Sequence, residues 1–235
     1  MSIRGRPAGG ASSARPVWPA PAGGPSAFRS VRREAEVGLA IRRSRFVAHV
    51  APVDGVAEAR AWLEAARALH PRATHHVSAF VAGFRGEERW CSDGGEPPGT
   101  AGRPVLEVLE RQGVVQVAVL VARYFGGTKL GAAGLVRAYA DACAAGLREA
   151  GLVTFRRGRR GRVVAPYATY GPLRAWLQGR GVRVLAEGFG VHVTLELWVP
   201  EDQVAALATE VADRSAGAAR WEPGPWEYRA ADAVG

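Results

Sequence analysis

The sequence predicts an α+β protein with two domains, the second of which is ferredoxin-like. The chain has 235 residues, enough for two domains of about 100 residues each, and 48% of its residues are hydrophobic, which is typical of a globular core. Segments with strand-type alternation are interleaved with segments of helical spacing throughout. After residue 151 the order is β-α-β-β-α-β. We therefore expect one domain over residues 31–150 and a second over residues 151–231.

Strand and helix patterns alternate regularly in the first domain. Three apolar segments of strand type cover residues 45–53, 75–84 and 114–124. The third is the most hydrophobic and is therefore predicted to be a central strand. Apolar residues at helical spacing predict three helices, over residues 56–69, 104–111 and 135–150. Asp54 is a candidate N-cap for the first helix, Pro71 ends that helix, and Gly151 ends the third.

The second domain reads as two strand–helix–strand units. Residues 152–167 are strand-like, although a run of arginines interrupts them. A helix over residues 170–178 follows. Two strands, over residues 182–187 and 191–199, are separated by a glycine-rich hairpin signal. Pro200 begins a second helix, and a last strand covers residues 220–228.

Residues 1–30 are expected to form a disordered basic tail, because they are rich in Gly, Ala, Ser and Pro. The first 33 residues hold six arginines and no acidic residue, so they carry +6 of the net charge of +9 and leave +3 for the rest. Much of the basic character therefore belongs to the tail. The composition is also rich in Arg and nearly free of Lys, so net charge alone is a weak indicator of nucleic-acid binding.

The composition excludes several classes of protein. No apolar run approaches the ~18 residues that span a bilayer, so we expect no membrane partner. Cys91 and Cys143 are too few for a disulfide framework or a cysteine-rich metal site, and they fit a reducing cytoplasm. We expect a cytoplasmic protein with no metal and no cofactor.

The loop from Ser92 to Pro104 is the most unusual segment. It combines two acidic residues with four glycines and three prolines, which gives a tightly specified backbone. Asp93 and Glu96 can bind a metal or act as a base. Alternatively, Asp93 makes an Asx-turn and Glu96 caps the following helix. The candidate binding residues of this loop are Asp93, Glu96, Gly99, Thr100 and Gly102.

A second glycine-rich segment follows the central strand and precedes the last helix of the first domain. Backbone N–H groups at such a junction suit an anion, although the spacing matches neither a Walker A loop nor GxGxxG. The alternative is a tight strand-to-helix turn. We expect this segment and the loop 92–104 to meet in space and form one recognition surface. The candidate binding residues here are Arg123, Tyr124, Gly126, Gly127, Lys129, Gly131, Gly134 and Arg137.

Five arginines lie within seven residues at the start of the second domain. They can contact RNA phosphates, which would make binding dependent on salt. The alternative is a solvated hairpin or linker. No set of stacking aromatic residues accompanies them, so we expect neither sequence-specific RNA reading nor DNA specificity. The residues of this basic patch are Arg156, Arg157, Arg159, Arg160 and Arg162.

Three motifs together resemble the IMPACT family of bacterial and eukaryotic proteins. They are Arg43-Ser44-Arg45-Phe46, the loop 92–104, and the block that runs from Arg123 to Tyr139. The resemblance covers residues 31–150, and the C-terminal part is similar to the elongation-factor-like domain of the bacterial members. One departure is Gly94, which stands where the family usually has a second acidic residue after Asp93.

The resemblance implies a first domain like the second domain of ribosomal protein S5. It also implies a translation-associated regulator, linked in eukaryotic relatives to the stress response of amino-acid starvation. We expect a non-enzymatic protein that binds RNA, the ribosome or a translation-related protein partner, and we assign no catalytic residue. The alternative is an enzyme or sensor for a small phosphorylated ligand bound between loops 92–104 and 125–131.

Overall fold

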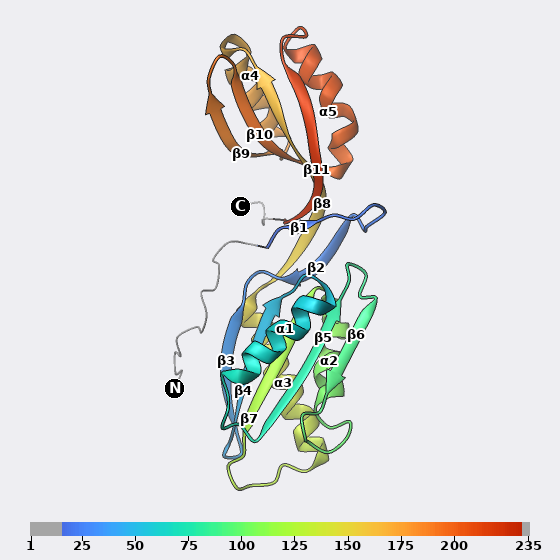
Figure 1. Cartoon of the computed structure of the whole chain (residues 1–235), viewed down its shortest axis with the longest axis vertical. Helices are drawn as coiled ribbons and strands as arrows, with labels where there is room; N and C mark the ends of the chain where they lie inside the picture. Colours follow the sequence, from blue (N-terminus) through green and yellow to red (C-terminus); the bar gives the residue numbers. More distant parts are fainter. Residues whose placement is uncertain (1–15, 232–235) are drawn as a thin grey trace. The chain divides into compact units, whose positions relative to one another are not determined.

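The structure, a computed structural model, describes residues 16–231 and divides into two compact units (Figure 1). The first consists mainly of residues Phe28–Thr154. Among the described residues, the second consists of Val17–Ala27 and residues 155–231. The division falls inside one long strand, three residues after the expected junction at residue 151. Within residues 16–231, no helix is long and apolar enough to cross a membrane.

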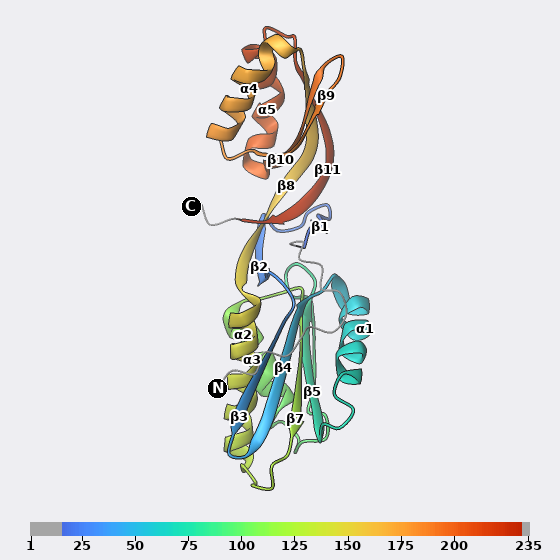
Figure 2. The ribbon, with the colours of Figure 1, turned by 90° about the vertical axis from the view of Figure 1, so that its left-hand side faces the viewer.

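The first unit is a five-stranded antiparallel sheet with helices on both faces. The strand order is β3-β4-β7-β5-β6. The strands are β3 Ala35–Ile41, β4 Ser44–Pro52, β7 Val117–Tyr124, β5 His75–Ala82 and β6 Glu88–Ser92. Helix α1, Gly55–Ala68, covers one face, while α2, Gly102–Gln112, and α3, Ala132–Ala150, cover the other (Figure 2).

Strand β7 is central, as predicted, and the reason is visible in its packing. Val117, Val119 and Val121 belong to the core under α2 and α3. Ala118 and Leu120 belong to the separate core under α1. Because both faces of the strand are covered, an unbroken apolar run is the stable choice here rather than alternation.

The second unit has the predicted β-α-β-β-α-β order. Its elements are β8 Leu152–Ala165, α4 Tyr167–Gly179, β9 Arg183–Phe189, β10 Val193–Pro200, α5 Glu201–Arg214 and β11 Arg220–Ala230. The strands pair in the order β11-β8-β10-β9, all antiparallel. Both helices lie on one face, where Leu173, Leu177, Leu207 and Val211 form the core with the sheet (Figure 2).

The expectation of a disordered tail is wrong for residues 16–30. Strand β1, Trp18–Pro19, pairs with β11, and strand β2, Ala27–Val31, pairs with β8. Trp18 is only 4% exposed, and its ring packs edge-on against Phe155 with the ring centroids 4.6 Å apart. Burial of one large aromatic side chain outweighs the weak strand preference of its Gly- and Pro-rich neighbours. Residues 1–15 lie outside the described residues.

Two other local expectations need correction. Strands β3 and β6 lie in segments for which the sequence predicts no strand. Asp54 precedes α1, but its side chain makes no capping hydrogen bond; instead its backbone N–H donates to the Glu58 carboxylate. Glu58 lies four residues after Asp54, one position beyond the Glu of a capping box, and it reaches back while Asp54 does not reach forward.

Candidate functional site

The two glycine-rich loops are joined through a buried ion pair. Arg123 Nη1 donates to Glu96 Oε1 at 2.6 Å, and both side chains are about 95% buried. Glu96 belongs to the loop 92–104, and Arg123 stands at the end of β7, just before the segment 125–131. The loops therefore approach one another through these two side chains.

Other side chains complete the surroundings of this pair. Tyr139 on α3 donates its hydroxyl hydrogen bond to Glu96 Oε1 at 2.7 Å, and His75 Nε2 lies 3.8 Å from Glu96 Oε2. The Arg123 guanidinium lies over the rings of Phe46 and Phe125, 5.5 Å and 5.4 Å from their centroids. Burial and the hydrogen bond to the Glu96 carboxylate raise the pKa of the Tyr139 phenol far above its ordinary value. Tyr139 therefore stays a hydrogen-bond donor.

In this arrangement the charges of Glu96 and Arg123 neutralise one another inside the protein. A carboxylate with a guanidinium and a phenol as partners has little left to offer a ligand, and the buried guanidinium is neutralised by the same contact. The interpretation of Glu96 as a helix cap is wrong, because its carboxylate faces Arg123 and not the start of α2. Its position locks the loop 92–104 onto β7 and α3.

Asp93 is the residue that holds the start of α2. Its Oδ1 accepts from the backbone N–H groups of Ala101 at 3.0 Å and Gly102 at 2.8 Å, and its Oδ2 accepts from Gly99 at 2.9 Å. Partial burial alone would raise the pKa of Asp93, but these three backbone donors outweigh it and hold the pKa below its ordinary value. Asp93 is thus an ionised structural carboxylate.

Gly94 has a steric explanation. Its φ is +58°, and a Cβ atom there would lie 2.0 Å from the backbone oxygen of His76. The loop packs directly on the backbone of β5, so a second acidic side chain does not fit beside Asp93 in this backbone arrangement. A role that needs both carboxylates is therefore not available to this chain.

The turn between β3 and β4 carries two arginines in an unfavourable backbone conformation. Arg42 and Arg43 have φ of 44° and 69°, the left-handed region that two-residue hairpins normally fill with Asn or Gly. Gly126 lies directly against this turn, since a Cβ atom at Gly126 would be 1.8 Å from the Arg43 backbone oxygen. The segment 125–131 therefore contacts the turn through the backbone at Gly126.

Replacing Gly126 by alanine is expected to lower the free energy of unfolding by about 1–3 kcal/mol, because backbone must move to admit the methyl group. Chemical denaturation of the two chains measures the difference. Gly38→Ala is the matched control, since an added Cβ there has only one ordinary contact, 4.0 Å from the Phe46 backbone oxygen. If the two variants lose equal free energy of unfolding, Gly126 does not lie in close contact with the turn.

Four exposed cations gather at this end of the first unit. They come from the β3–β4 turn and from the chain between β7 and the first turns of α3, which lie at the same end in Figure 1. None has a carboxylate within ion-pair distance among residues 16–231. We call this set the cationic end: Arg42, Arg43, Lys129 and Arg137. Phe125, 45% exposed, lies beside it.

An open groove of about 510 Å³ runs between the β3–β4 turn and α3. Arg42 and Arg137 line it together with Asp141 and the apolar side chains of Ile41 and Leu130. The remaining candidate residues have structural positions. Thr100 donates to the Pro97 oxygen, the Tyr124 hydroxyl contacts His70, Gly127 and Gly131 have positive φ, and Gly134 lies in the first turn of α3.

The run of arginines on β8 is not a free basic patch. Acidic side chains from neighbouring elements pair with four of the five, and the fifth, Arg159, donates to the backbone oxygen of Gly224 at 2.9 Å. The pairs are Arg156–Asp202, Arg157–Glu201, Arg160–Glu196 and Arg162–Glu222. The expectation of a patch open to phosphates needs this correction, because β10, β11 and the start of α5 place an acid beside four of the five cations.

Sequence reasoning missed two groups of residues. Nothing in the sequence indicates that Arg42 belongs to the cationic end, since only the backbone places it in the same turn as Arg43. A cavity beneath α1 was also missed, because charged residues seven apart on a helix, such as Arg60 and Arg67, look like any solvated face.

Comparison with known proteins matches two family models along the chain. The Impact N-terminal domain matches residues 42–147, and a domain of unknown function, DUF1949, matches residues 163–218. The chain is 31% identical over 201 residues to the IMPACT family member YvyE of Bacillus subtilis, covering 86% of this chain and 93% of that protein. It is 36% identical over 181 residues to the family member YigZ of Escherichia coli, covering 75% and 88%.

A solved structure, described as that of a hypothetical protein, covers 83% of this chain and 96% of its own with 30% identity and a TM-score of 0.55. Fold, motifs and relatives thus agree. The chain belongs to the IMPACT family.

Proposed function

We propose that this protein is a non-enzymatic, translation-associated protein whose first unit binds RNA through the cationic end. One observation carries the proposal: Arg42, Arg43, Lys129 and Arg137 are exposed, lie at one end of the unit and have no carboxylate partner among residues 16–231. Cations left unpaired in this way are free to replace the counterions of a phosphate backbone.

The chemistry of the remaining candidates supports binding rather than catalysis. Asp93 accepts hydrogen bonds from three backbone N–H groups, and the charges of Glu96 and Arg123 neutralise one another. Burial raises the pKa of the Cys143 thiol to about 12, so that it stays protonated and is a poor nucleophile. These groups hold the loops in place.

The open form of this end favours RNA over an enclosed phosphorylated metabolite. The alternative function drew on free carboxylates in the loop 92–104 opposite the cations of the second loop, and the contacts of Asp93 and Glu96 inside the protein leave neither carboxylate free. Phe125 adds an exposed ring beside the cations, and unpaired bases stack on such rings in single-stranded RNA. We therefore expect single-stranded loops of structured RNA to be preferred over regular duplex.

The test compares two variants that each lose four positive charges. One is Arg42→Gln, Arg43→Gln, Lys129→Gln and Arg137→Gln. The matched control removes four exposed but paired arginines of the second unit: Arg156→Gln, Arg160→Gln, Arg162→Gln and Arg220→Gln. Binding to a ribosomal RNA fragment with single-stranded loops is measured at several salt concentrations.

The first variant is expected to bind at least ten times more weakly at low salt than the wild-type chain. Its slope of log affinity against log salt is expected to be shallower by about 3, since each lost phosphate contact removes ~0.7. The control variant should keep wild-type affinity and slope. Equal weakening in both variants, or no RNA binding by the wild-type chain, would refute this proposal.

A further inference from the structure

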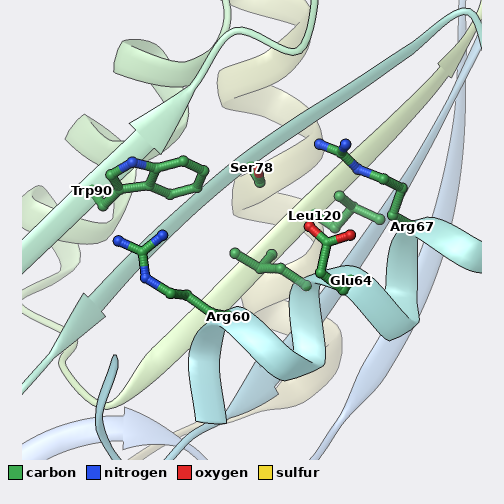
Figure 3. Close-up of a pocket in the computed structure, with 7 residues that line it drawn as sticks. Arg60, Glu64, Arg67, Ser78, Trp90 and Leu120 are labelled. Carbon is green, nitrogen blue, oxygen red and sulfur yellow. The ribbon is translucent and has the colours of Figure 1, made fainter. Parts of the chain in front are cut away.

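A cavity of about 260 Å³ lies between α1 and the sheet of the first unit, on the face away from α2 and α3. Its floor is apolar and includes Leu63 and Leu120. Figure 3 shows Trp90 at one side, Arg67 at the other, and Ser78 between them on β5. The cavity is slightly smaller than ordinary ligand sites, which measure about 300–1,000 Å³, so it suits a small ligand whose charged group stays at the rim.

The charged side chains around this cavity have no ion-pair partner in the described part of the chain. Arg60, Glu64 and Arg67 occupy successive turns of α1, yet none forms an ion pair there. Ser78 is only 2% exposed, and its hydroxyl makes no hydrogen bond to any residue from 16 to 231. Because Ser78 lines the cavity, its hydroxyl is available to hydrogen-bond a group that enters it.

The wall of the cavity is built for a planar group. The Trp90 ring stacks on the Phe80 ring, with centroids 5.6 Å apart and planes inclined by 22°. The Arg60 guanidinium lies 5.6 Å from the centroid of Trp90 and 5.8 Å from that of Phe80. Aromatic rings and guanidinium planes are the surfaces on which unpaired bases stack.

We propose that this cavity binds a single nucleotide whose base carries an exocyclic amino group. The base would lie against Trp90 and the apolar floor, and Glu64 would accept a hydrogen bond from the amino group. Ser78 would donate to or accept from the edge of the base. Arg60 and Arg67 would hold the phosphate at the rim, where a guanidinium can bind phosphate oxygens with two N–H groups.

Charge and size select this ligand among the alternatives. Two guanidinium groups and one carboxylate give the rim a net charge of +1, which favours an anion over a zwitterion such as an amino acid. The polar groups exclude a hydrocarbon. The volume admits one base and its sugar but not a dinucleotide.

The nucleotide has two sources with the same chemistry: a free nucleoside monophosphate, or an unstacked nucleotide within RNA. The second source rests on the proposed function, whereas the first stands without it. Isothermal titration of the full chain with the four ribonucleoside monophosphates tests the free nucleotide directly. Titration with a short single-stranded oligonucleotide that carries all four bases tests the nucleotide within RNA.

We expect cytidine monophosphate to bind at least ten times more tightly than uridine monophosphate, because uracil lacks the amino group. Glu64→Gln should reduce that preference, which a purely structural residue would not do. Arg67→Gln and Ser78→Ala should each weaken binding at least tenfold. Arg111→Gln, which removes an exposed arginine on α2, should not.

The outcomes separate this proposal from the proposed function. If the variant lacking the cationic end still binds monophosphates, the cavity acts independently of RNA binding by that end. If the oligonucleotide alone binds, and Arg67→Gln weakens it, the source is RNA. If neither the monophosphates nor the oligonucleotide responds to Arg67→Gln and Ser78→Ala, the cavity is not a nucleotide site and the inference is overturned.

Discussion

Replacing Arg123 by methionine is expected to lower the free energy of unfolding of the first unit by about 3–5 kcal/mol. The substitution leaves the Glu96 carboxylate buried with its guanidinium partner removed. A buried ion without its counter-charge costs far more than the lost contact itself, because its hydration has already been given up. The loss is measured by chemical denaturation of the full chain at neutral pH.

Two controls separate this effect from the general loss of an arginine. Arg33→Met breaks an ion pair with Glu149 in which both side chains are more than half exposed, so it should cost less than about 1 kcal/mol. The double substitution Arg123→Met with Glu96→Leu removes both charges and should be less destabilising than Arg123→Met alone. If Arg123→Met costs no more than Arg33→Met, the pair does not hold the two loops together.

The stability of the first unit should fall as the pH is lowered from about 7 to about 4, by about 3 kcal/mol in total. His49 on β4 and His70, which follows α1, are both buried, with their Nε2 atoms 2.5 Å apart. Only one of these two atoms can carry a proton. Burial, reinforced by the neighbouring His70, lowers the pKa of His49 from 6.5 to about 4.

The stability falls in acid because the unfolded chain binds protons more readily than the folded chain does. Between these two pKa values the unfolded chain holds a proton on His49 and the folded chain does not, so acid favours unfolding. Above the unfolded value the stabilisation is fully present, and it is lost as the pH falls toward the folded value. Burial, with smaller effects of His76 and Arg45, also lowers the pKa of His70, so His70 acts in the same direction.

Other charged and polar groups surround this pair without reversing the effect. Glu36 Oε2 on β3 lies 3.9 Å from His49 Nδ1, and the Tyr124 hydroxyl lies 2.8 Å from His70 Nδ1. Denaturation midpoints at pH 7.5 and pH 5 measure the effect, with His49→Gln expected to flatten the dependence. Substitution of the exposed His192 should leave it unchanged. A pH dependence as steep in His49→Gln as in the wild-type chain would contradict the assignment.

Helices and strands could be predicted from the sequence where the spacing of their apolar residues is regular. The central strand β7 and the β-α-β-β-α-β order of the second unit could be predicted because each element carries its own apolar pattern. The edge strands β3 and β6 could not, since half of their residues face solvent and only pairing with β4 and β5 defines them. Trp18 shows the same limit, because its burial depends on Phe155 far along the chain.

The candidate site, too, could be predicted from the sequence only in part. Asp93, Glu96 and Arg123 could be recognised as unusual charges in glycine-rich surroundings. Their roles could not be assigned, because the partner of Glu96 lies 27 residues away and was as plausible a ligand group as a buried counter-ion. The arginines of β8 look free in the sequence, and only the register of three strands and the start of α5 brings acids opposite them.

Photocrosslinking tests the cationic end most directly. The full chain is bound at low salt to a ribosomal RNA fragment that carries 4-thiouridine in its single-stranded loops, irradiated, and digested to identify the crosslinked peptides. We predict crosslinks within residues 42–45 and 125–137. Crosslinks confined to β8, β10 and β11 would contradict the account.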